Sequence, residues 1–593
     1  MTLQEETRKN QWQSRFRTAN KKYKDWETRF QCTKLYEAYE GKQWANMADL
    51  ANDPPYVTNL IYSTIQVKNA FLLLSRPKYL LAPVPGSSDW SQEFAFSAVQ
   101  MKEDLLNSII GNNHQHFTET ILEVVMESYF RFGIIEVGYA ANWIKNPNAS
   151  LPEEFPDEHE EGDKPSKQKL QEIPENEKVY FKHISAANFR VGGIDTTYLD
   201  RCNWVGYWEY FYKDDLEAVP GLKLPEDINS TSVASDVEDK LSDEEKLYSG
   251  DLLKVWHIWD IRKKMRRLVL DSGEELWEEP FLRLPLFDLR WTLRNKGFYP
   301  IPPVSQWMSP QREYNEAREQ MRSHRRRFTR KFQYVGDTME PEELNKFESG
   351  PDGTLVKVPT RDAISPINNP ELGTTVTNSL VVSKDDFNIV SGTSSEARGQ
   401  ADRQTATQAN IIDAKSKIRE SAEEAKLSRL YELVGREALL VMQERFTEGI
   451  WIQQTGDIAP ANVLFQEVQT NQATYKYITQ EEISLIANFD FRIEVDVVSM
   501  STIRNEDEKR KFIEFVALTN QYPTIALSAP LIRECAYRVG FRNEIVIREM
   551  QKMATLAMIG QMTAASQAAQ GTVQQMTPPA NEEIQQQLEG QIQ

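Results

Sequence analysis

Three carboxylates in the C-terminal third of the chain, Asp490, Glu494 and Asp496, are the residues best suited to catalytic chemistry. Polar and apolar residues alternate in this segment, so a β-strand would carry all three carboxylates on one face. A nuclease can hold two divalent metal ions on such a face. The other interpretation, which we favour, is a half-buried strand whose polar face meets solvent or a neighbouring subunit, with Arg492 balancing the acids.

The short motifs of the common enzyme classes are absent from the sequence. It contains no GxxxxGK[ST] or GxGxxG phosphate-binding loop, no HExxH zinc motif and no GxSxG nucleophile motif. Its 593 residues include only six histidines. His114 and His116 are two positions apart, which on a helix turns their side chains in different directions. We therefore expect no catalytic residue, no metal site and no cofactor.

Length and cysteine content restrict the class of protein. The chain has 593 residues, 40% of them hydrophobic. This length is greater than one ordinary hydrophobic core accommodates, so it predicts a large domain with insertions or several subdomains. Cys32, Cys202 and Cys535 are too far apart for a metal knuckle or a CxxC motif. Their odd number argues against a secreted disulfide scaffold, so we expect a reducing, intracellular compartment.

The sequence predicts neither a signal peptide nor a membrane span. Residues 1–16 lack the apolar stretch of a signal peptide. The best apolar run, 70–84, is interrupted by Arg76, Pro77 and Lys78, whereas a spanning helix needs roughly 20 apolar residues.

Charge is distributed unevenly along the chain. The formal net charge is −19, so the chain as a whole should repel free nucleic acid. Segments 8–34 and 312–331 are nevertheless basic, and acidic residues concentrate in 153–177 and 214–251. The net charge therefore says little about any one surface.

The sequence of the N-terminal half predicts helices followed by a β-rich unit. Apolar residues at three- and four-residue steps, including Trp12, Phe16 and Trp26, predict one helix over 2–40 with an aromatic stripe. Further helices are predicted at 57–75, 88–112 and 115–132, and strands at 134–143, 178–184, 202–212, 253–261, 265–271 and 285–291. The segments 146–177 and 221–250 are polar and read as loops or insertions.

A strongly charged helix is predicted over 310–333. It has too few large apolar residues to pack in a domain core, and its acids precede its bases, which complements the helix dipole. Such a helix is stable beside other copies of itself, bridged by ion pairs, or as a solvent-exposed link between subdomains; the pattern leaves both open.

Short elements and one long helix follow. A turn-rich segment, 334–359, is predicted to contain a strand at 354–358, and a helix follows at 373–388. Residues 390–408 are small and polar, which suits a loop lining a passage or a plain surface connection. Beyond them we predict a long helix at 409–446, strands at 463–469 and 489–499, helices at 505–520 and 528–560, and a Gln/Ala/Thr-rich tail.

Four segments are informative when taken in their order along the chain: Pro55–Ile61 with Ser75–Tyr79, Ser128–Tyr139, Phe298–Pro303 with Ser309–Asn315, and Ile389–Ser395 with Thr405–Ala409. Together they resemble the portal protein of tailed bacteriophages. The resemblance implies a ring, mostly of twelve copies, at one capsid vertex, through which DNA is packaged and ejected.

The resemblance also implies an α+β portal fold with a wing, a helical stem, a small α/β clip and a helical crown. The N-terminal helices and the β-rich wing would occupy 1–309, followed by a first stem helix at 310–333, the clip at 334–366 and a second stem helix at 367–389. The channel loop would be 390–408, and the long wing helix and wing strands 409–520. The crown would be 521–560, followed by a Gln-rich flexible or partly helical tail at 561–593.

Site residues follow from the matching segments. For the channel loop they are Ser391, Gly392, Ser394, Ser395, Arg398, Gly399 and Arg403. For the stem they are Arg318, Arg322, Arg325, Arg326 and Arg330. For the clip they are Asp337, Glu340, Glu342, Glu343, Lys346 and Asp352.

The implied partners are further copies of the chain, double-stranded DNA in the channel, the terminase large subunit, the head–tail adaptor or neck proteins, the major capsid protein and a scaffolding protein, with no membrane. Such a protein is located in the virion, and in the host cytoplasm during assembly. A ring of chains at −19 each is non-adhesive to DNA, which favours sliding over binding. The alternatives are the metal-dependent nuclease above and another virion structural protein, such as an internal head or tail protein.

Overall fold

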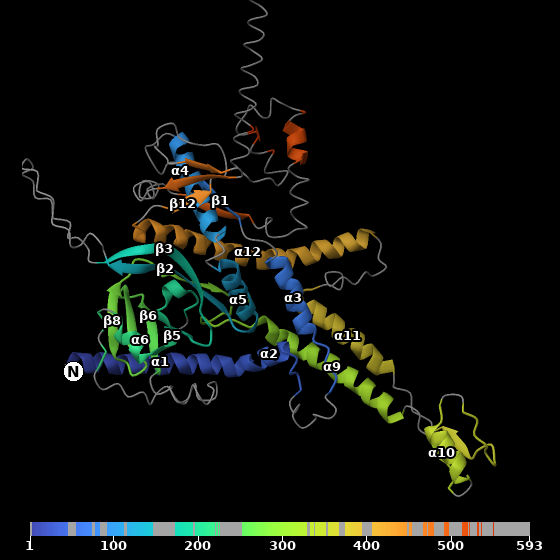
Figure 1. Ribbon diagram of the computed structural model, residues 1–593. Coiled ribbons are helices and arrows are strands. Elements are labelled where there is room, and N and C mark those ends of the chain that lie inside the picture. Colours follow the sequence, from blue (N-terminus) through green and yellow to red (C-terminus); the bar gives the residue numbers. More distant parts are fainter. Residues whose placement is uncertain are drawn as a thin grey trace, which may run out of the picture. The chain divides into compact units, whose positions relative to one another are not determined.

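The structure is a computed structural model in which helices and strands are both extensive (Figure 1), as expected for an α+β protein. It describes residues 3–447 apart from 45–54, 74–77, 84–91, 112–115, 146–171, 194–195, 220, 223, 226–251, 329–331, 337–338, 352–353, 367–373 and 394–405; beyond residue 447 it describes 450–453, 467–470, 473–478, 491–496, 513–519 and the positions 521, 531, 532, 535 and 550.

The chain divides into two compact units, each formed by two separate stretches of sequence. Unit 1 contains Met1–Leu73 and Ser108–Ile450, and unit 2 contains Leu74–Asn107 and Trp451–Gln593. The predicted tail at 561–593 and nearly all of the predicted crown at 521–560 lie outside the described residues.

Unit 1 contains a five-stranded antiparallel sheet covered by the first helix. Its strand order is β4 (Phe189–Gly192), β5 (Trp204–Tyr212), β6 (Leu252–Asp260), β7 (Met265–Leu270), β8 (Glu275–Pro280). Helix α1 (Leu3–Phe30) lies along this sheet (Figure 1).

Aromatic side chains hold α1 to the sheet. Phe16 stacks on Trp256 with ring centroids 4.3 Å apart, and Trp12 and Phe16 both meet the edge of Trp204. Every predicted member of the aromatic stripe through Trp26 is buried, so the predicted stripe is confirmed. Burial of a large apolar side chain stabilises a fold by roughly 1.5–3 kcal/mol.

The predicted helix at 2–40 is interrupted at Gln31. Its backbone is left-handed there (φ 51°, ψ 47°), and a second helix, α2 (Cys32–Tyr39), starts at the next residue. Side chains are buried on both sides of the break: Trp26 before it, and Cys32 and Leu35 of α2 after it. Left-handed backbone is uncommon for a residue with a side chain, and residue 31 is a glutamine, so the break could not be predicted from the sequence.

A three-stranded antiparallel sheet, β3–β2–β9, is the second sheet of unit 1. It contains β2 (Gly133–Lys145), β3 (Glu172–His183) and β9 (Leu286–Leu289). Two helices pack against it, α5 (Phe117–Phe130) and α12 (Ala406–Arg445). The long helix predicted at 409–446 is confirmed as α12.

Unit 1 also contains two helices paired with each other and a small hairpin unit. Helix α9 (Pro303–Phe328) packs against α11 (Thr374–Ser391), with α3 (Leu60–Leu72) beside α9. Between the paired helices in sequence come β10 (Phe332–Tyr334), α10 (Pro341–Ser349) and β11 (Ile364–Pro366). Phe332 pairs antiparallel with Pro366.

Unit 2 contains two small sheets and most of α4 (Gln92–Gly111). Strand β1 (Lys78–Pro83) pairs antiparallel with β15 (Phe491–Asp496). The Asn107 side chain of α4 accepts from the Tyr79 N–H and donates to the Tyr79 carbonyl, both at 3.0 Å. The second sheet has the order β12 (Ile450–Gln453), β14 (Ala473–Ile478), β13 (Glu467–Thr470).

Several element predictions differ from the structure. The charged helix starts at Pro303 rather than 310 and ends at Phe328. Residues 354–358 form no strand, and the prediction missed α10, whose nine residues are mostly polar. It also missed β4 and β8, because β4 has only four residues and β8 contains three acids.

His257 on β6 should make this part of the fold sensitive to pH. Its ring stacks on Tyr207 at 4.8 Å, and neither ring nitrogen has a hydrogen-bond partner among the described residues. Burial, reinforced by Arg266 and Lys182, lowers the His257 pKa to about 3. Glu209 lies 3.6 Å away but is already bound by Lys182 at 2.6 Å.

We therefore predict that acid destabilises the wild type through His257. The unfolded chain protonates this imidazole near its ordinary pKa of roughly 6.5 and the folded chain does not, so stability falls as pH drops below that value. Between pH 7.5 and 5.5 the loss is about 1.4 kcal/mol. His257→Phe keeps the stacking and should remove this component, measured by denaturant unfolding at both pH values. His116→Asn, at an exposed histidine, is the matched control; an unchanged pH dependence in His257→Phe would refute the prediction.

Candidate functional site

The first half of α9 is fixed to the body of unit 1 by buried polar side chains. The Gln311 amide oxygen accepts from the backbone N–H groups of Leu60 and Ile61 at 2.9 and 3.3 Å, and its nitrogen donates to the Thr58 carbonyl at 2.7 Å. One turn later, the Asn315 oxygen accepts from the Thr58 N–H at 3.0 Å. Both side chains are almost fully buried.

These contacts satisfy the start of α3. The first N–H groups of a helix have no partner within the helix, and a buried unpaired donor costs about 1–3 kcal/mol. Gln311 accepts hydrogen bonds from two of these N–H groups, and the side chain of Asn59, the N-cap residue, accepts one from the Tyr62 N–H. Gln311, Asn315 and Glu319 are spaced four residues apart, so the acceptors for backbone N–H groups of 56–61 lie on one face of α9. The expectation that this helix does not pack in a core is wrong for its first half.

The predicted stem arginines lie at and beyond this face. Arg318 donates to the Tyr56 hydroxyl at 3.1 Å and stacks over its ring at 4.9 Å. Arg322 pairs with Glu319 at 3.4 Å, and Glu319 also accepts from the Tyr56 N–H. Arg325 and Arg326 are exposed. Arg330 lies outside the described residues.

Helix α11 packs one face on α9 and exposes the opposite face. Phe387 is fully buried and meets the edge of Trp307 at 6.3 Å, and the Ser379 hydroxyl donates to Glu313 at 3.1 Å. The opposite face carries three apolar side chains that are 55–66% exposed, Val381, Val382 and Ile389. Val390, which is 44% exposed, lies nearer to the packed face.

The predicted channel loop starts later than the sequence indicates. Ser391 is the last residue of α11 and is buried, and Gly392 follows in a left-handed turn (φ 72°). The helix continues to Ser391 because the Gly392 N–H still bonds to the Asn388 carbonyl at 2.9 Å. Five of the predicted loop residues lie outside the described residues: Ser394, Ser395, Arg398, Gly399 and Arg403.

The hairpin unit at 332–366, predicted as the clip, is small and mostly exposed. Phe332 and Phe347 contact each other edge to face at 5.0 Å, and Ala363 is fully buried. Its exposed apolar side chains include Leu355, which is 93% exposed, and Val358. A unit with so little buried surface depends on contacts outside itself to cover these side chains.

The predicted clip residues contribute charge rather than core. Lys346 donates to Glu343 at 2.6 Å, and Glu343 also accepts from the Lys357 N–H at 2.9 Å. These two contacts lower the Glu343 pKa. Glu340 and Glu342 are exposed beside them. Asp337 and Asp352 lie outside the described residues.

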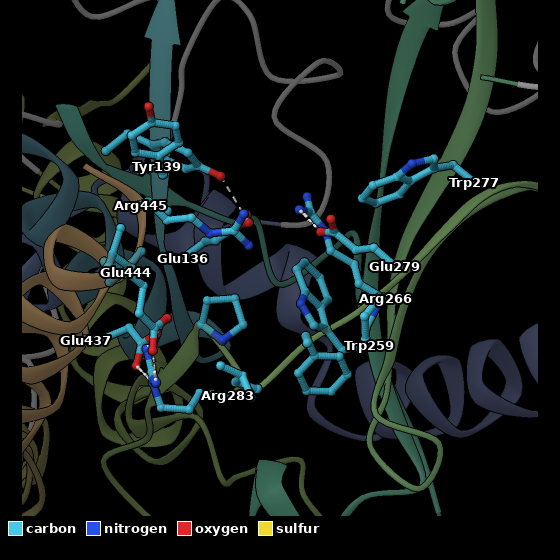
Figure 2. A pocket seen from close by; sticks show the side chains of 18 residues that line it. Glu136, Tyr139, Trp259, Arg266, Trp277, Glu279, Arg283, Glu437, Glu444 and Arg445 are labelled. Carbon is cyan, nitrogen blue, oxygen red and sulfur yellow. Dashed lines mark hydrogen bonds and ion pairs between the residues drawn. The ribbon is translucent and has the colours of Figure 1, made fainter. Parts of the chain in front are cut away.

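A pocket of about 430 Å³ lies between α12 and the sheets of unit 1 (Figure 2). Arg283 binds Glu444 through two hydrogen bonds, at 2.7 and 2.9 Å, and Glu437 through a third, at 3.3 Å. Burial raises the Glu437 pKa, and Arg283 opposes this. Across the pocket, Arg266 pairs with Glu279 at 3.4 Å.

The charged side chains that line this pocket are largely paired with one another. Its deepest acid, Glu136, is 2% exposed and accepts from the hydroxyls of Tyr207 and Tyr180 at 2.6 and 3.2 Å. Four carboxylates and three guanidinium groups line it, so the charges nearly balance. We read it as the joint that fixes α12 to the sheets, which the sequence did not reveal because its residues are far apart in the chain.

The acidic triad is only partly described. The predicted strand is confirmed as β15, and Ile493 is buried as its apolar face requires. Asp490 and the side chains of Glu494 and Asp496 lie outside the described part. Among the residues that the structure describes, no cluster of three or more His, Cys, Asp or Glu is placed to hold a metal ion.

Within the same residues, no helix is long and apolar enough to cross a membrane.

The chain matches the model of a known protein family. A family model described as phage P22-like portal protein matches residues 139–593, which is more than half of the chain. No curated protein matches the sequence. The matched stretch begins within β2 and includes α9, α11 and α12.

We predict that Gln311→Ala destabilises unit 1 by about 2–3 kcal/mol, because it leaves two buried N–H groups at the start of α3 without an acceptor. Denaturant unfolding followed by tryptophan fluorescence measures the change. Gln306→Ala is the matched control: the same substitution on the same helix at an exposed position, expected within about 0.5 kcal/mol of wild type. Equal effects of the two variants would contradict the role given to Gln311.

Proposed function

Because the chain belongs to the phage P22-like portal protein family, we propose that it forms the portal ring at one vertex of a phage capsid. The family is structural and implies a role as a channel in DNA packaging. In our proposal the ring, of twelve copies, conducts DNA inward during packaging and outward during ejection. It performs no catalytic turnover, and it is a virion component that assembles in the host cytoplasm.

The observation that best supports the proposed ring is the exposed apolar face of α11. Three aliphatic side chains, Val381, Val382 and Ile389, lie on the face of α11 opposite Phe387, and such a face is typical of a surface that another protein covers. In a ring, each stem would be α9 and α11 of one copy beside those of the next. Covering the three side chains would then contribute a few kcal/mol per interface, at roughly 25 cal/mol per Å².

The arginines of α9 would complete the contacts between copies. Arg325 and Arg326 follow the buried half of α9 and are exposed. We propose that these two and Arg322 form ion pairs with acids of the adjacent stem, in preference to binding DNA. Asp385 and Asp386 lie exposed on α11 and supply such acids. Exposed pairs add little individually, so they would set the register of the stems more than the strength of the ring.

We assign the segment 392–405, between α11 and α12, to the lining of the channel. Its sequence is rich in Gly, Ser, Thr and Ala, so it offers a sliding polymer few bulky side chains. Arg398 and Arg403 would supply limited phosphate contacts. With −19 charges on every chain, the ring as a whole would repel DNA, which favours passage over retention.

The hairpin unit would be the clip. Its exposed Leu355 and Val358 would be covered first by the terminase large subunit during packaging and then by the head–tail adaptor proteins. The two sheets of unit 1, with α1, α5 and α12, would form the wing that contacts the major capsid protein and a scaffolding protein. Residues 521–560 would form the crown.

We predict that Val381→Asp combined with Ile389→Asp prevents ring formation, because each charge would have to be buried at the interface between stems. Light scattering should then give a small species in place of the ring, with the circular dichroism of the folded chain retained. Val219→Asp, at a valine that is 47% exposed outside the stem, is the matched control and should assemble normally. Assembly of the double variant at the wild-type mass would refute the stem interface.

The clip assignment predicts that Leu355→Glu combined with Val358→Glu abolishes docking of the terminase large subunit while the ring still forms. Co-sedimentation of the cognate motor with purified rings measures this. Leu282→Glu, at a leucine that is 76% exposed outside the clip, should leave docking intact. Unchanged docking by the clip variant would remove this assignment.

A further inference from the structure

A second pocket of unit 1, of about 420 Å³, lies between α1 and two turns of the five-stranded sheet. The turns are those that follow β4 and β6. This pocket differs from the first in its charge. Its charged lining residues are Arg15, Lys22, Arg262, Lys263 and one acid, Asp260.

Among the residues that the structure describes, no carboxylate neutralises the four cations. Lys22 donates to the Gly193 carbonyl at 2.6 Å, and Arg15 lies over the Trp12 ring at 4.5 Å. Within the described part of the chain, none of the four forms an ion pair with a carboxylate. The single acid, Asp260, is 5% exposed and accepts from the Lys263 backbone N–H at 3.1 Å.

The first pocket provides an internal comparison. There the numbers of carboxylates and guanidinium groups are nearly equal, and Arg283 and Arg266 are each paired with an acid. In the second pocket the cations exceed the acid by three. A chain with a net charge of −19 has acids to spare, so three uncompensated cations around one cavity indicate a site kept open for an external anion.

Neutral groups add hydrogen-bond donors to the same wall. Ser14 of α1 and Asn203 before β5 both line the cavity. Two glycines shape its rim: a Cβ on Gly192 would meet the Trp204 indole at 2.0 Å, and Gly193 has a φ of +148°. Hydroxyl, amide and guanidinium donors together are the groups that proteins use for phosphate oxygens.

We propose that this pocket binds a small, multiply charged oxyanion of the phosphate class. The volume falls in the range of roughly 300–1,000 Å³ found for small-molecule sites. Duplex DNA is too thick to enter, so the ligand is a free phosphate compound or a single phosphoryl group. The site also assigns a role to part of the basic segment 8–34, which the stem, channel and clip leave unexplained.

The test uses the full-length protein and inorganic pyrophosphate, with binding measured by calorimetry at low and at physiological salt. Two variants remove cations from opposite sides of the pocket: Arg262→Ala with Lys263→Ala, and Arg15→Ala with Lys22→Ala. Each should weaken binding at least ten-fold. The matched control, Arg17→Ala with Lys21→Ala, removes two exposed cations of α1 that do not line the cavity, and should change affinity less than two-fold.

Three results would overturn the proposal. One is no pyrophosphate binding by the wild type at millimolar concentration. Another is an equal loss in the control, since diffuse surface charge would then explain the binding. The last is binding of a short DNA duplex or of an acidic peptide, with the same residue dependence but without pyrophosphate binding, which would make the pocket part of a macromolecular interface. None of these results depends on whether the chain forms a ring.

Discussion

The buried amides of Gln311 and Asn315 hold α9 in two environments at once. They bind the backbone at Thr58–Ile61, which fixes the first half of the helix within unit 1, where Trp307 is buried. Toward its C-terminal end, Arg325 and Arg326 are exposed. Because α9 is one continuous helix, fixing its first half also orients the second half and its partner α11. In the proposed ring, this would fix the direction of the stem.

The rest of unit 1 gives that helix a rigid base. The aromatic stripe of α1 fastens the five-stranded sheet through Phe16 and Trp256, and the Trp26 indole donates to the Pro300 carbonyl at 2.7 Å, just before α9 begins. Near its C-terminal end, α12 is joined to the sheets through Arg283 and Glu444.

Periodic patterns made much of this predictable from the sequence. The stripe through Trp12 and the length of α12 follow from helical spacing, and the alternation around Ile493 follows from strand spacing. The packing of the first half of α9 was missed because Gln311 and Asn315 are polar and were expected at the surface, whereas both are buried against the start of α3, which is distant in sequence. The same limit hid the two pockets, since their lining residues come together only in three dimensions. The break at Gln31 has no glycine or proline to mark it.

The mass of the purified chain in solution, by native mass spectrometry with negative-stain images of the same sample, tests the central claim most directly. The chain should assemble, alone or with its cognate scaffolding protein, into a particle of about twelve times the 68.6 kDa of one chain, with an axial hole. A folded chain that stays monomeric or dimeric under both conditions would contradict a portal ring. A monomer that also cleaved DNA with added Mg²⁺, and lost this activity in Glu494→Ala, would favour the nuclease instead.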